Sequence, residues 1–225
     1  MIVLDYVKKA FNQGQPNEFW AIRGVSLDLP LREVTVLKGP SGSGKTTLLA
    51  MIGCLSRPTS GRISLDGRLL SGLPERFLTQ VRRRTFGFVF QQFNLIKGLS
   101  VLENVMLPAY PLGLPRGPLH ANARRLLEQF RLGHKAAERV EWLSGGEAQR
   151  TAICRALING PEILIADEPT ANLDTQLSRE FMVIVQELKA EGITVLLSSH
   201  DPAVYAGPGV DRVVEMRDGL LEETG

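Results

Sequence analysis

Residues 39–46 read Gly39-Pro40-Ser41-Gly42-Ser43-Gly44-Lys45-Thr46, and this string decides the fold. An apolar run at residues 34–37 precedes it and another at residues 48–55 follows it, which predicts a strand, a glycine-rich loop and a helix. This pattern in this context is typical of a phosphate-binding (Walker A) loop. The alternative, a flexible turn before a helix, explains neither the lysine nor the hydroxyl.

The chemistry of this loop follows from its residue types. Glycines let backbone N–H groups turn inward around phosphate oxygens, and the start of the following helix adds the positive end of its dipole. We expect Lys45 to reach the β- and γ-phosphates of a nucleotide and Thr46 to ligate Mg²⁺ through its hydroxyl. The predicted phosphate site comprises Gly39, Pro40, Ser41, Gly42, Ser43, Gly44, Lys45, Thr46 and Thr47.

Acidic residues and a histidine follow two later apolar runs. Residues 163–166 are followed by Asp167 and Glu168, and residues 194–199 by His200. Because ligands of open α/β sheets bind at the carboxyl ends of the strands, we expect these side chains beside the phosphate loop. Asp167 is expected to hold Mg²⁺, Glu168 to orient or deprotonate the attacking water, and His200 to reach the γ-phosphate. The alternatives are a solvated acidic turn and a solvated or helix-capping histidine.

The remaining patterns predict an α/β fold. Alternating Val25, Leu27 and Leu29 and an Asp66-Gly67 turn indicate an antiparallel β region near the front. Residues 102–156 are expected to form a mainly helical lobe inserted into an α/β core with a parallel sheet. The prolines expected to break the segment before its helical pattern are Pro108, Pro111, Pro115 and Pro118. The face of a later helix that stops at Gly192 is formed by Leu177, Phe181, Ile184, Val185 and Leu188.

Composition narrows the functional classes. With 225 residues, 44% hydrophobic, the chain is expected to be one domain with an ordinary core. A net charge of +2 argues against a nucleic-acid partner. The sequence has no secretory signal pattern and no apolar run of about 20 residues, so we expect it to stay in the cytoplasm and to reach a membrane only through a partner. Two cysteines, Cys54 and Cys154, fit a reducing compartment and form no metal-ligand cluster.

Residues 143–150, Leu-Ser-Gly-Gly-Glu-Ala-Gln-Arg, contain a second candidate for an anion-binding helix start. As a purely structural feature, Ser144 would cap the helix and Glu147 would complete a capping box. Together with the preceding motifs, however, this string closely resembles the signature of the ATP-binding cassette family. The resemblance covers almost the whole chain. It extends to Gln91 at the family's Q-loop, to Asn172-Leu173-Asp174 at its D-loop and to His200 at its switch histidine.

This resemblance implies a phosphate-loop NTPase with a RecA-like α/β core. Residues 1–95 and 157–225 would form that core with its β region, and residues 96–156 the helical lobe. ATP and Mg²⁺ are the implied ligands, and Phe11 occupies the position of the aromatic residue that stacks on adenine. The implied catalytic residues are Lys45, Gln91, Glu168 and His200. The implied Mg²⁺ ligands are Thr46, Gln91 and Asp167.

The resemblance also implies partners. Two copies would pair head to tail, so that one protomer completes the ATP site of the other. The residues that it would contribute are Ser144, Gly145 and Gly146, and Asp174 is a further implied nucleotide-binding residue. A membrane permease would dock near residues 92–96 and hold the subunit on the cytoplasmic face of the inner membrane. Residues 92–96 alternatively serve only internal packing, and the Arg82-Arg83-Arg84 run is a solvated face or a contact to anionic lipid.

Several strings are similar to the lipoprotein-release and macrolide-export group, which favours export, efflux or lipid extraction. They are residues 39–49, 57–61, 86–91, 101–105 and 167–174. Departures at Cys54, at Ser56 and at residues 147–149 leave the branch open. The main alternative is a non-transport ATPase of the same family that regulates cell-wall or division machinery through a permease-like partner. A kinase or GTPase would not account for the signature, Gln91 and His200 together.

Overall fold

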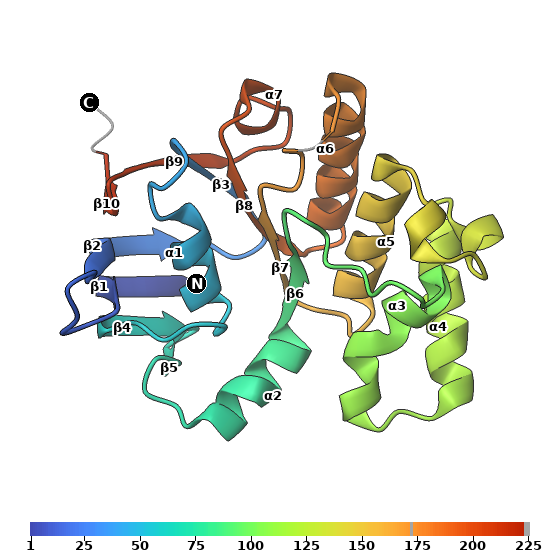
Figure 1. Ribbon diagram of the computed structural model, residues 1–225, viewed down its shortest axis with the longest axis horizontal. Helices are drawn as coiled ribbons and strands as arrows, with labels where there is room; N and C mark the ends of the chain where they lie inside the picture. Colours follow the sequence, from blue (N-terminus) through green and yellow to red (C-terminus); the bar gives the residue numbers. More distant parts are fainter. Residues whose placement is uncertain (172, 223–225) are drawn as a thin grey trace.

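Two β-sheets and their covering helices form the fold, which the computed structural model describes for residues 1–171 and 173–222 (Figure 1). The first sheet is antiparallel, in the order β2-β1-β4-β5. Its strands are β1 (Ile2–Phe11), β2 (Phe19–Leu29), β4 (Ser60–Leu65) and β5 (Arg68–Leu69). Asp66 and Gly67 join β4 to β5 with φ of 47° and 76°, as in a type I′ hairpin turn. The predicted antiparallel β region and its turn are confirmed.

The second sheet is the central one, in the order β10-β9-β3-β8-β7-β6, and only β10 runs antiparallel to its neighbour among the described strands. Its strands are β3 (Val34–Lys38), β6 (Phe86–Val89), β7 (Ile163–Asp167), β8 (Thr194–Ser199), β9 (Arg212–Arg217) and β10 (Leu220–Leu221). The register pairs Asp167 with Ser198 and Lys38 with Ser199. The carboxyl ends of β3, β7 and β8 therefore meet at one edge.

The helix after the phosphate loop, α1 (Lys45–Ile52), differs from its predicted bounds at both ends. The sequence predicted a helix over residues 48–55. The helix begins earlier because Gly44, with a φ of 103°, serves as its N-cap within the loop itself. It ends earlier because Gly53 is its C-cap and the next residue, Cys54, turns the chain out of the helix with a φ of 60°. Gly53 itself packs on the central sheet, where a Cβ would lie 2.5 Å from the ring of Phe88. Apolar composition thus located the helix but not its ends.

Residues 101–157 contain the expected helices. They are α3 (Val101–Met106), the 3₁₀ turn η1 (Leu107–Leu112), α4 (Arg116–Gln129), the turns η2 (Gly133–Lys135) and η3 (Val140–Trp142), and α5 (Gly145–Leu157). Pro108 and Pro111 lie in η1, and Pro115 caps α4. Pro118 does not break the segment as predicted, because it lies in the first turn of α4, where a backbone N–H has no helical acceptor.

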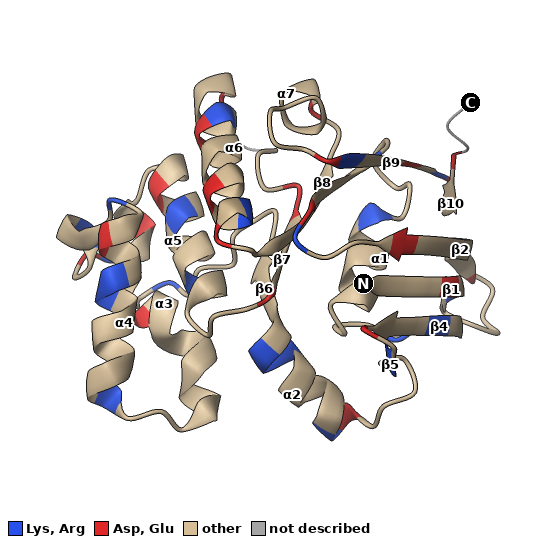
Figure 2. Ribbon diagram, turned by 180° about the vertical axis from the view of Figure 1, so that it is seen from behind, with Lys and Arg blue, Asp and Glu red and all other residues tan. Residues whose placement is uncertain are grey.

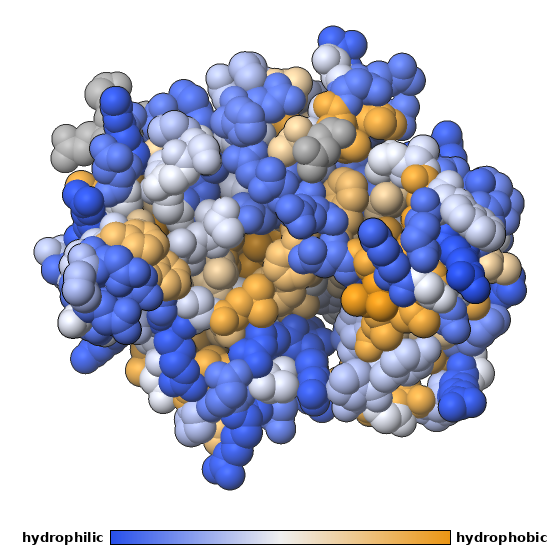
Figure 3. All heavy atoms as spheres, in the orientation of Figure 1, coloured by the Kyte–Doolittle hydropathy of each residue, from blue (hydrophilic) through white to orange (hydrophobic). Residues whose placement is uncertain are grey.

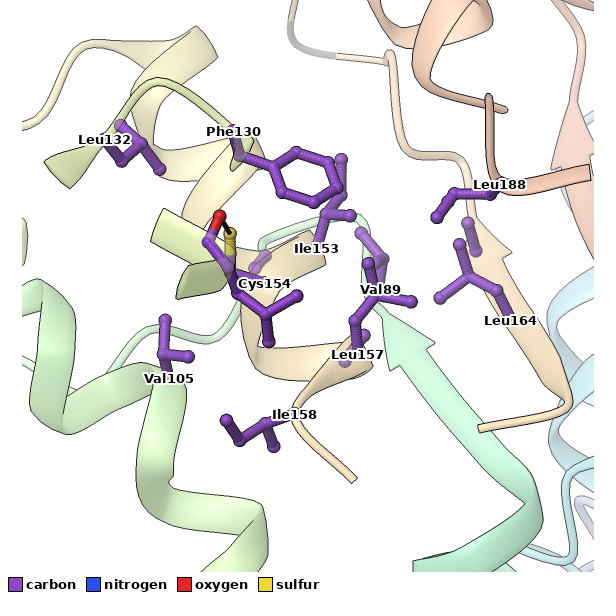
Figure 4. Close-up of a cluster of buried hydrophobic side chains, with 14 of the residues drawn as sticks. Val89, Val105, Phe130, Leu132, Ile153, Cys154, Leu157, Ile158, Leu164 and Leu188 are labelled. Carbon is purple, nitrogen blue, oxygen red and sulfur yellow. Dashed lines mark hydrogen bonds between the residues drawn. The ribbon is translucent and has the colours of Figure 1, made fainter. Parts of the chain in front are cut away.

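The central sheet is buried on both faces, as the alternation of β7 illustrates. Leu164 and Ala166 belong to a hydrophobic cluster with α3, α4, α5 and α6 (Thr175–Ala190), part of which Figure 4 shows. Ile163 and Ile165 belong to a second cluster with the antiparallel sheet, α1 and α2 (Glu75–Thr85). The helical segment therefore shares its core with one face of the sheet.

Helix α6 follows β7 and covers the central sheet, as the sequence predicted. Phe181, Val185 and Leu188 are buried, whereas Leu177 and Ile184 are half-buried. Gly192 has a φ of 86° just beyond the helix end. A short helix, α7 (Pro202–Tyr205), follows β8. Across residues 1–171 and 173–222, no helix combines the length and apolar character needed to cross a membrane.

Candidate functional site

The phosphate loop leaves β3 at the carboxyl edge of the central sheet and packs against the ends of two other strands. Gly39 has a φ of 153°, and a Cβ there would lie 2.1 Å from the carbonyl oxygen of Met216 in β9. A Cβ at Gly44 would lie 2.7 Å from the carbonyl oxygen of Ala21 in β2. Only glycine fits at either position, because a side chain would clash with the backbone of a neighbouring strand. The loop is therefore packed directly against β9 and β2.

The start of α1 offers donors to an anion. No side chain caps this helix, so its first backbone N–H groups remain for another acceptor. The hydroxyl of Ser43 is buried beside them and has no hydrogen-bond partner among the described residues. Buried polar groups are normally satisfied. The free hydroxyl, the N–H groups and the helix dipole together fit a phosphate group.

Lys45 is the basic residue of the loop, and its buried ammonium lies near Glu168 at the carboxyl edge of the central sheet. Its side chain is 5% exposed, and its ammonium donates to the carbonyl oxygens of Gly39, at 2.7 Å, and Pro40, at 3.0 Å. The same ammonium lies 3.3 Å from a carboxylate oxygen of Glu168. A buried ammonium needs such partners.

Asp167 lies behind Thr46 and is held by two hydroxyl groups. Thr46 donates to Asp167 Oδ1 at 2.9 Å, and Ser198 of β8 donates to the same oxygen at 2.6 Å. The Ser198 hydroxyl also accepts from the backbone N–H of Glu168 at 2.8 Å. Sequence reasoning missed Ser198, because its role depends on the register of β7 against β8.

Glu168 and His200 form a pair at the mouth of the same edge. Glu168 Oε2 lies 3.0 Å from His200 Nδ1, and the two side chains are 13% and 65% exposed. Glu168 has a φ of 44°, an uncommon conformation for a residue with a side chain. Such backbone strain clusters at functional sites. The arrangement holds a carboxylate between a buried ammonium and an accessible imidazole.

These groups line a cavity of about 470 Å³ at the carboxyl edge. Its walls are residues 41–47 of the loop with Phe19, Trp20, Ala21, Arg23, Gln91, Glu168, His200, Asp218 and Gly219. The volume falls in the usual range of about 300–1,000 Å³ for small-molecule sites. One part of the wall is the phosphate loop, and another is the aromatic start of β2.

The aromatic wall differs from the sequence prediction. Phe11 does not line the cavity; its ring stacks on Phe19 with centroids 5.3 Å apart and planes 19° apart. Phe19 and Trp20 line the cavity instead. Sequence reasoning missed them, and also Arg23 and Asp218, because they meet the loop only through the packing of β2 and of the β9–β10 turn.

The predicted signature residues lie elsewhere, at the start of α5. Ser144 accepts from the backbone N–H of Glu147 at 3.3 Å, and Glu147 accepts from the backbone N–H of Ser144 at 2.8 Å. This capping box is the predicted one, and the N–H of Ser144 lowers the pKa of Glu147. Ser144 and Gly145 are exposed, Gly146 packs under Leu177, and none of the three lines the cavity.

The segment after β7 links the cavity to the start of α5. Gln149 of α5 is buried and donates to the carbonyl oxygen of Pro169 at 2.9 Å. Asp174 caps α6 by accepting from the backbone N–H of Leu177 at 2.9 Å, and it is exposed and outside the cavity lining. Asn172 of the predicted D-loop lies outside the described residues. The structure thus brings together Lys45, Thr46, Gln91, Asp167, Glu168 and His200, but not Phe11, Ser144, Gly145, Gly146 or Asp174.

Known proteins match the chain over nearly its full length. Residues 22–171 match the ABC transporter family. The lipoprotein-releasing system ATP-binding protein LolD of Paramagnetospirillum magneticum is 41% identical over 98% of this chain and 96% of its own. The pyoverdine export ATP-binding/permease protein PvdT of Pseudomonas fluorescens is 41% identical over 98% of this chain, which spans only 33% of that protein. A dimeric, post-hydrolysis structure of the cassette MJ0796 with ADP and Pi is 36% identical, with a TM-score of 0.89 covering 99% of this chain and 97% of that one.

Proposed function

The chain belongs to the ABC transporter family, and we propose that it is an ATP-hydrolysing subunit that pairs head to tail around ATP and drives a membrane permease. The observation that carries this proposal is the cavity edge, where buried Lys45 lies 3.3 Å from Glu168 on a preformed phosphate loop. The relatives LolD and PvdT are named as ATP-binding proteins, and the MJ0796 relative holds ADP and Pi, which supports ATP as the nucleotide.

In this proposal the chain binds the triphosphate from one side. The first N–H groups of α1, the Ser43 hydroxyl and the Lys45 ammonium donate to the β- and γ-phosphate oxygens. Thr46 and Asp167, joined by a hydrogen bond of 2.9 Å, would supply oxygen ligands for Mg²⁺, and Gln91, which lines the same cavity, would supply a third. When bound, Mg²⁺ would neutralise charge on the phosphates.

Hydrolysis needs a base near the γ-phosphate, and Glu168 is the group available. Its carboxylate orients a water and takes its proton, while Lys45 balances the charge that builds on the phosphate. His200 holds the carboxylate through the 3.0 Å contact and reaches the γ-phosphate from its exposed position. Ser198 fixes both Asp167 and the backbone of Glu168, so it positions the pair.

The start of α5 supplies the far wall of the site in a second copy. Capping uses Ser144 Oγ as an acceptor, so its O–H and the first N–H groups of the helix, at Gly145 and Gly146, remain as donors. These donors lie outside the cavity of their own chain. They therefore complete the γ-phosphate site of a partner, with Asp174 beside them. We assign residues 1–95 and 157–225 to the catalytic core and residues 96–156 to the helical lobe.

A groove beside β6 is the proposed permease site. It has a volume of about 410 Å³ and is lined mainly by aromatic, proline and arginine side chains, with no acidic residue in its described lining. Its principal residues are Phe86, Phe88, Phe90, Pro108, Pro111, Arg82, Arg83 and Arg155. Figure 2 shows the basic residues at the end of α2 next to β6, and Figure 3 shows hydrophobic side chains around the hollow near β6. An apolar permease segment with an acidic side chain fits this lining.

The position of the groove is relevant to the prediction that a permease docks near residues 92–96. Asn94 lines it, whereas Phe93 and Leu95 pack against the hydrophobic cluster that α3, α4, α5 and α6 form on one face of the central sheet. Arg155 donates to the carbonyl oxygens of Phe93 and Asn94 and fixes this segment to α5. We therefore propose that residues 92–96 support the docking groove rather than form all of it.

The cargo of the system follows from the permease. Because the relatives include a lipoprotein-releasing system and an exporter, we propose export, efflux or lipoprotein extraction at the cytoplasmic face of the inner membrane. A regulator of cell-wall or division machinery would use the same subunit with a different partner. Copurification from membranes, followed by identification of the partner, separates the two.

The proposed ATP hydrolysis is tested by measuring phosphate release from Mg²⁺-ATP by the purified chain. We expect Glu168→Gln to keep ATP binding and to slow release by about two orders of magnitude or more, because the base is lost. Normal turnover by this variant would remove Glu168 from its assigned role.

A further inference from the structure

Trp142 is the most exposed large hydrophobic side chain of the described residues, at 71%. It lies at the end of η3, in the yellow segment that precedes α5 in Figure 1. Tryptophan is the largest apolar side chain and is enriched in the centres of protein interfaces. Its exposure two residues before Ser144 therefore points to a surface that another molecule covers.

The turn that carries Trp142 is held in place by its neighbours. The N–H of Trp142 donates to the carbonyl oxygen of Arg139 at 3.1 Å, and Glu141 accepts from the N–H of Gly98 at 2.7 Å. Val140 is buried, and Leu143 packs against the hydrophobic cluster that α3, α4, α5 and α6 form on the central sheet. The residues on either side thus fix the turn, and the indole projects into solvent from an ordered backbone.

The exposed aromatic end of the ATP cavity is the matching surface. Phe19 and Trp20 line the cavity and are still 54% and 37% exposed. Phe19 is backed by the stacked ring of Phe11, and the Lys9 ammonium lies 5.1 Å from the centroid of the Phe11 ring. A nucleobase on this wall would be stacked from one side only, with its other face open to water.

Trp142 and Ser144 are close enough to act on the same nucleotide. Two residues span at most about 7 Å of chain, and the indole adds to that reach. If Ser144 meets the γ-phosphate on the partner's phosphate loop, Trp142 lies over the mouth of the partner's cavity. This step rests on the proposed head-to-tail pairing.

We propose that Trp142 of one protomer covers the aromatic end of its partner's ATP cavity and contacts the nucleobase that rests on Phe19 and Trp20. Closure of the dimer then depends on the base as well as on the phosphates. The partner is a second copy of this chain with a nucleoside triphosphate bound. Inorganic tripolyphosphate, which has no base, closes the dimer less well.

Fluorescence tests the contact directly, since the chain has only two tryptophans. In the Glu168→Gln, Trp20→Phe double variant, Trp142 is the sole tryptophan, and light scattering reports the dimer in the same sample. We expect ATP to shift Trp142 emission to shorter wavelength and to reduce iodide quenching severalfold, whereas Mg²⁺-tripolyphosphate gives less dimer. A dimer in which iodide quenches Trp142 as well as in the monomer overturns the proposal.

A second measurement uses Trp142→Ala in the Glu168→Gln background. We expect the dimer dissociation constant with ATP to rise about tenfold or more, as for an interface anchor, with unchanged ATP affinity in dilute monomer. Trp142→Phe should keep most of the affinity. Tyr110→Ala, which removes another exposed aromatic ring from the helical segment, is the control.

The outcomes separate this inference from the proposed function. Equal dimerisation of Trp142→Ala and its parent overturns the role of Trp142 and leaves the shared site intact. Absence of any ATP-dependent dimer in Glu168→Gln itself overturns the proposed function, and the contact of Trp142 with it. Thermal melting of each variant checks the fold, which loss of an exposed ring should change little.

Discussion

The first turns of α1 and α5 are both glycine-rich helix starts, yet they treat their backbone donors differently. α1 begins at Gly44 without a side-chain cap, and its first residues line the cavity. α5 begins at Ser144 with a complete capping box and lies outside the cavity. We propose that the first start receives an anion and that the second, whose cap is complete, offers its remaining donors to the nucleotide of a second copy.

Replacing Lys45 by alanine should have the largest effect on the α1 side of this comparison. Loss of a charge-assisted hydrogen bond to phosphate is expected to weaken ATP binding roughly tenfold to a hundredfold. Titration with a fluorescent ATP analogue measures it. ATP affinity equal to that of the wild type would show that the loop is not the phosphate site.

The substitution Ser144→Ala tests the proposed role of the start of α5, and the chain contains a matched control. Ser100 caps α3 through the same kind of capping box, with Glu103 in the place of Glu147. Each substitution should cost about 1 kcal/mol of stability, because each removes a cap. Only Ser144→Ala should also weaken ATP-driven dimerisation, by about tenfold, because our proposal gives only Ser144 a hydrogen bond to the phosphate of the partner's nucleotide.

Sedimentation of both variants with ATP in the Glu168→Gln background gives the dimer affinities, and thermal melting gives the stabilities. Equal dimerisation of the two variants would mean that the start of α5 is only a capped helix.

The substitution Ser198→Ala tests how the residues beside the phosphate loop are positioned. The substitution removes one hydrogen bond to Asp167 and one from the N–H of Glu168, so we expect kcat to fall severalfold to tenfold with a smaller change in ATP affinity. Ser199→Ala on the same strand removes a hydroxyl that accepts from Asp201 and serves as the control. Equal effects on kcat would assign Ser198 to general strand stability.

The smallest expected effect concerns the pH dependence of the α5 cap. The N–H of Ser144 holds the pKa of Glu147 below its unfolded value, which is about 4.3, so the ionised carboxylate stabilises the folded state above that pH. This contribution is lost as the pH falls through the folded pKa. Denaturant midpoints of wild type and Glu147→Gln should differ near neutral pH and converge as the pH falls through the lowered folded pKa of Glu147. A gap that widens in acid would contradict this sign.

The sequence predicted the parts of the site that local patterns encode. The phosphate loop, the acids after β7 and the histidine after β8 are each a short motif at the end of an apolar strand, and parallel pairing brings them to one edge. The Ser144 cap was predictable for the same reason, since a capping box is local.

Other parts depend on tertiary packing and were missed. Ser198 is an ordinary strand residue until the register places it against Asp167. Phe19 and Trp20 line the cavity in place of Phe11 because the end of β2 lies against the loop, which no spacing in the sequence reveals. The end of α1 was misplaced because the chain leaves the helix at Cys54, whose φ is 60°, inside the apolar run for which the sequence predicted a helix.

The central claim is that one chain holds only part of the catalytic site and a second copy supplies the rest. Size-exclusion chromatography with light scattering of Glu168→Gln, with and without ATP, tests it most directly. We predict the monomer mass of 24.8 kDa without nucleotide and about twice that mass with ATP. A particle that stays at 24.8 kDa with saturating ATP, together with wild-type turnover per chain that does not change on dilution, would contradict the account.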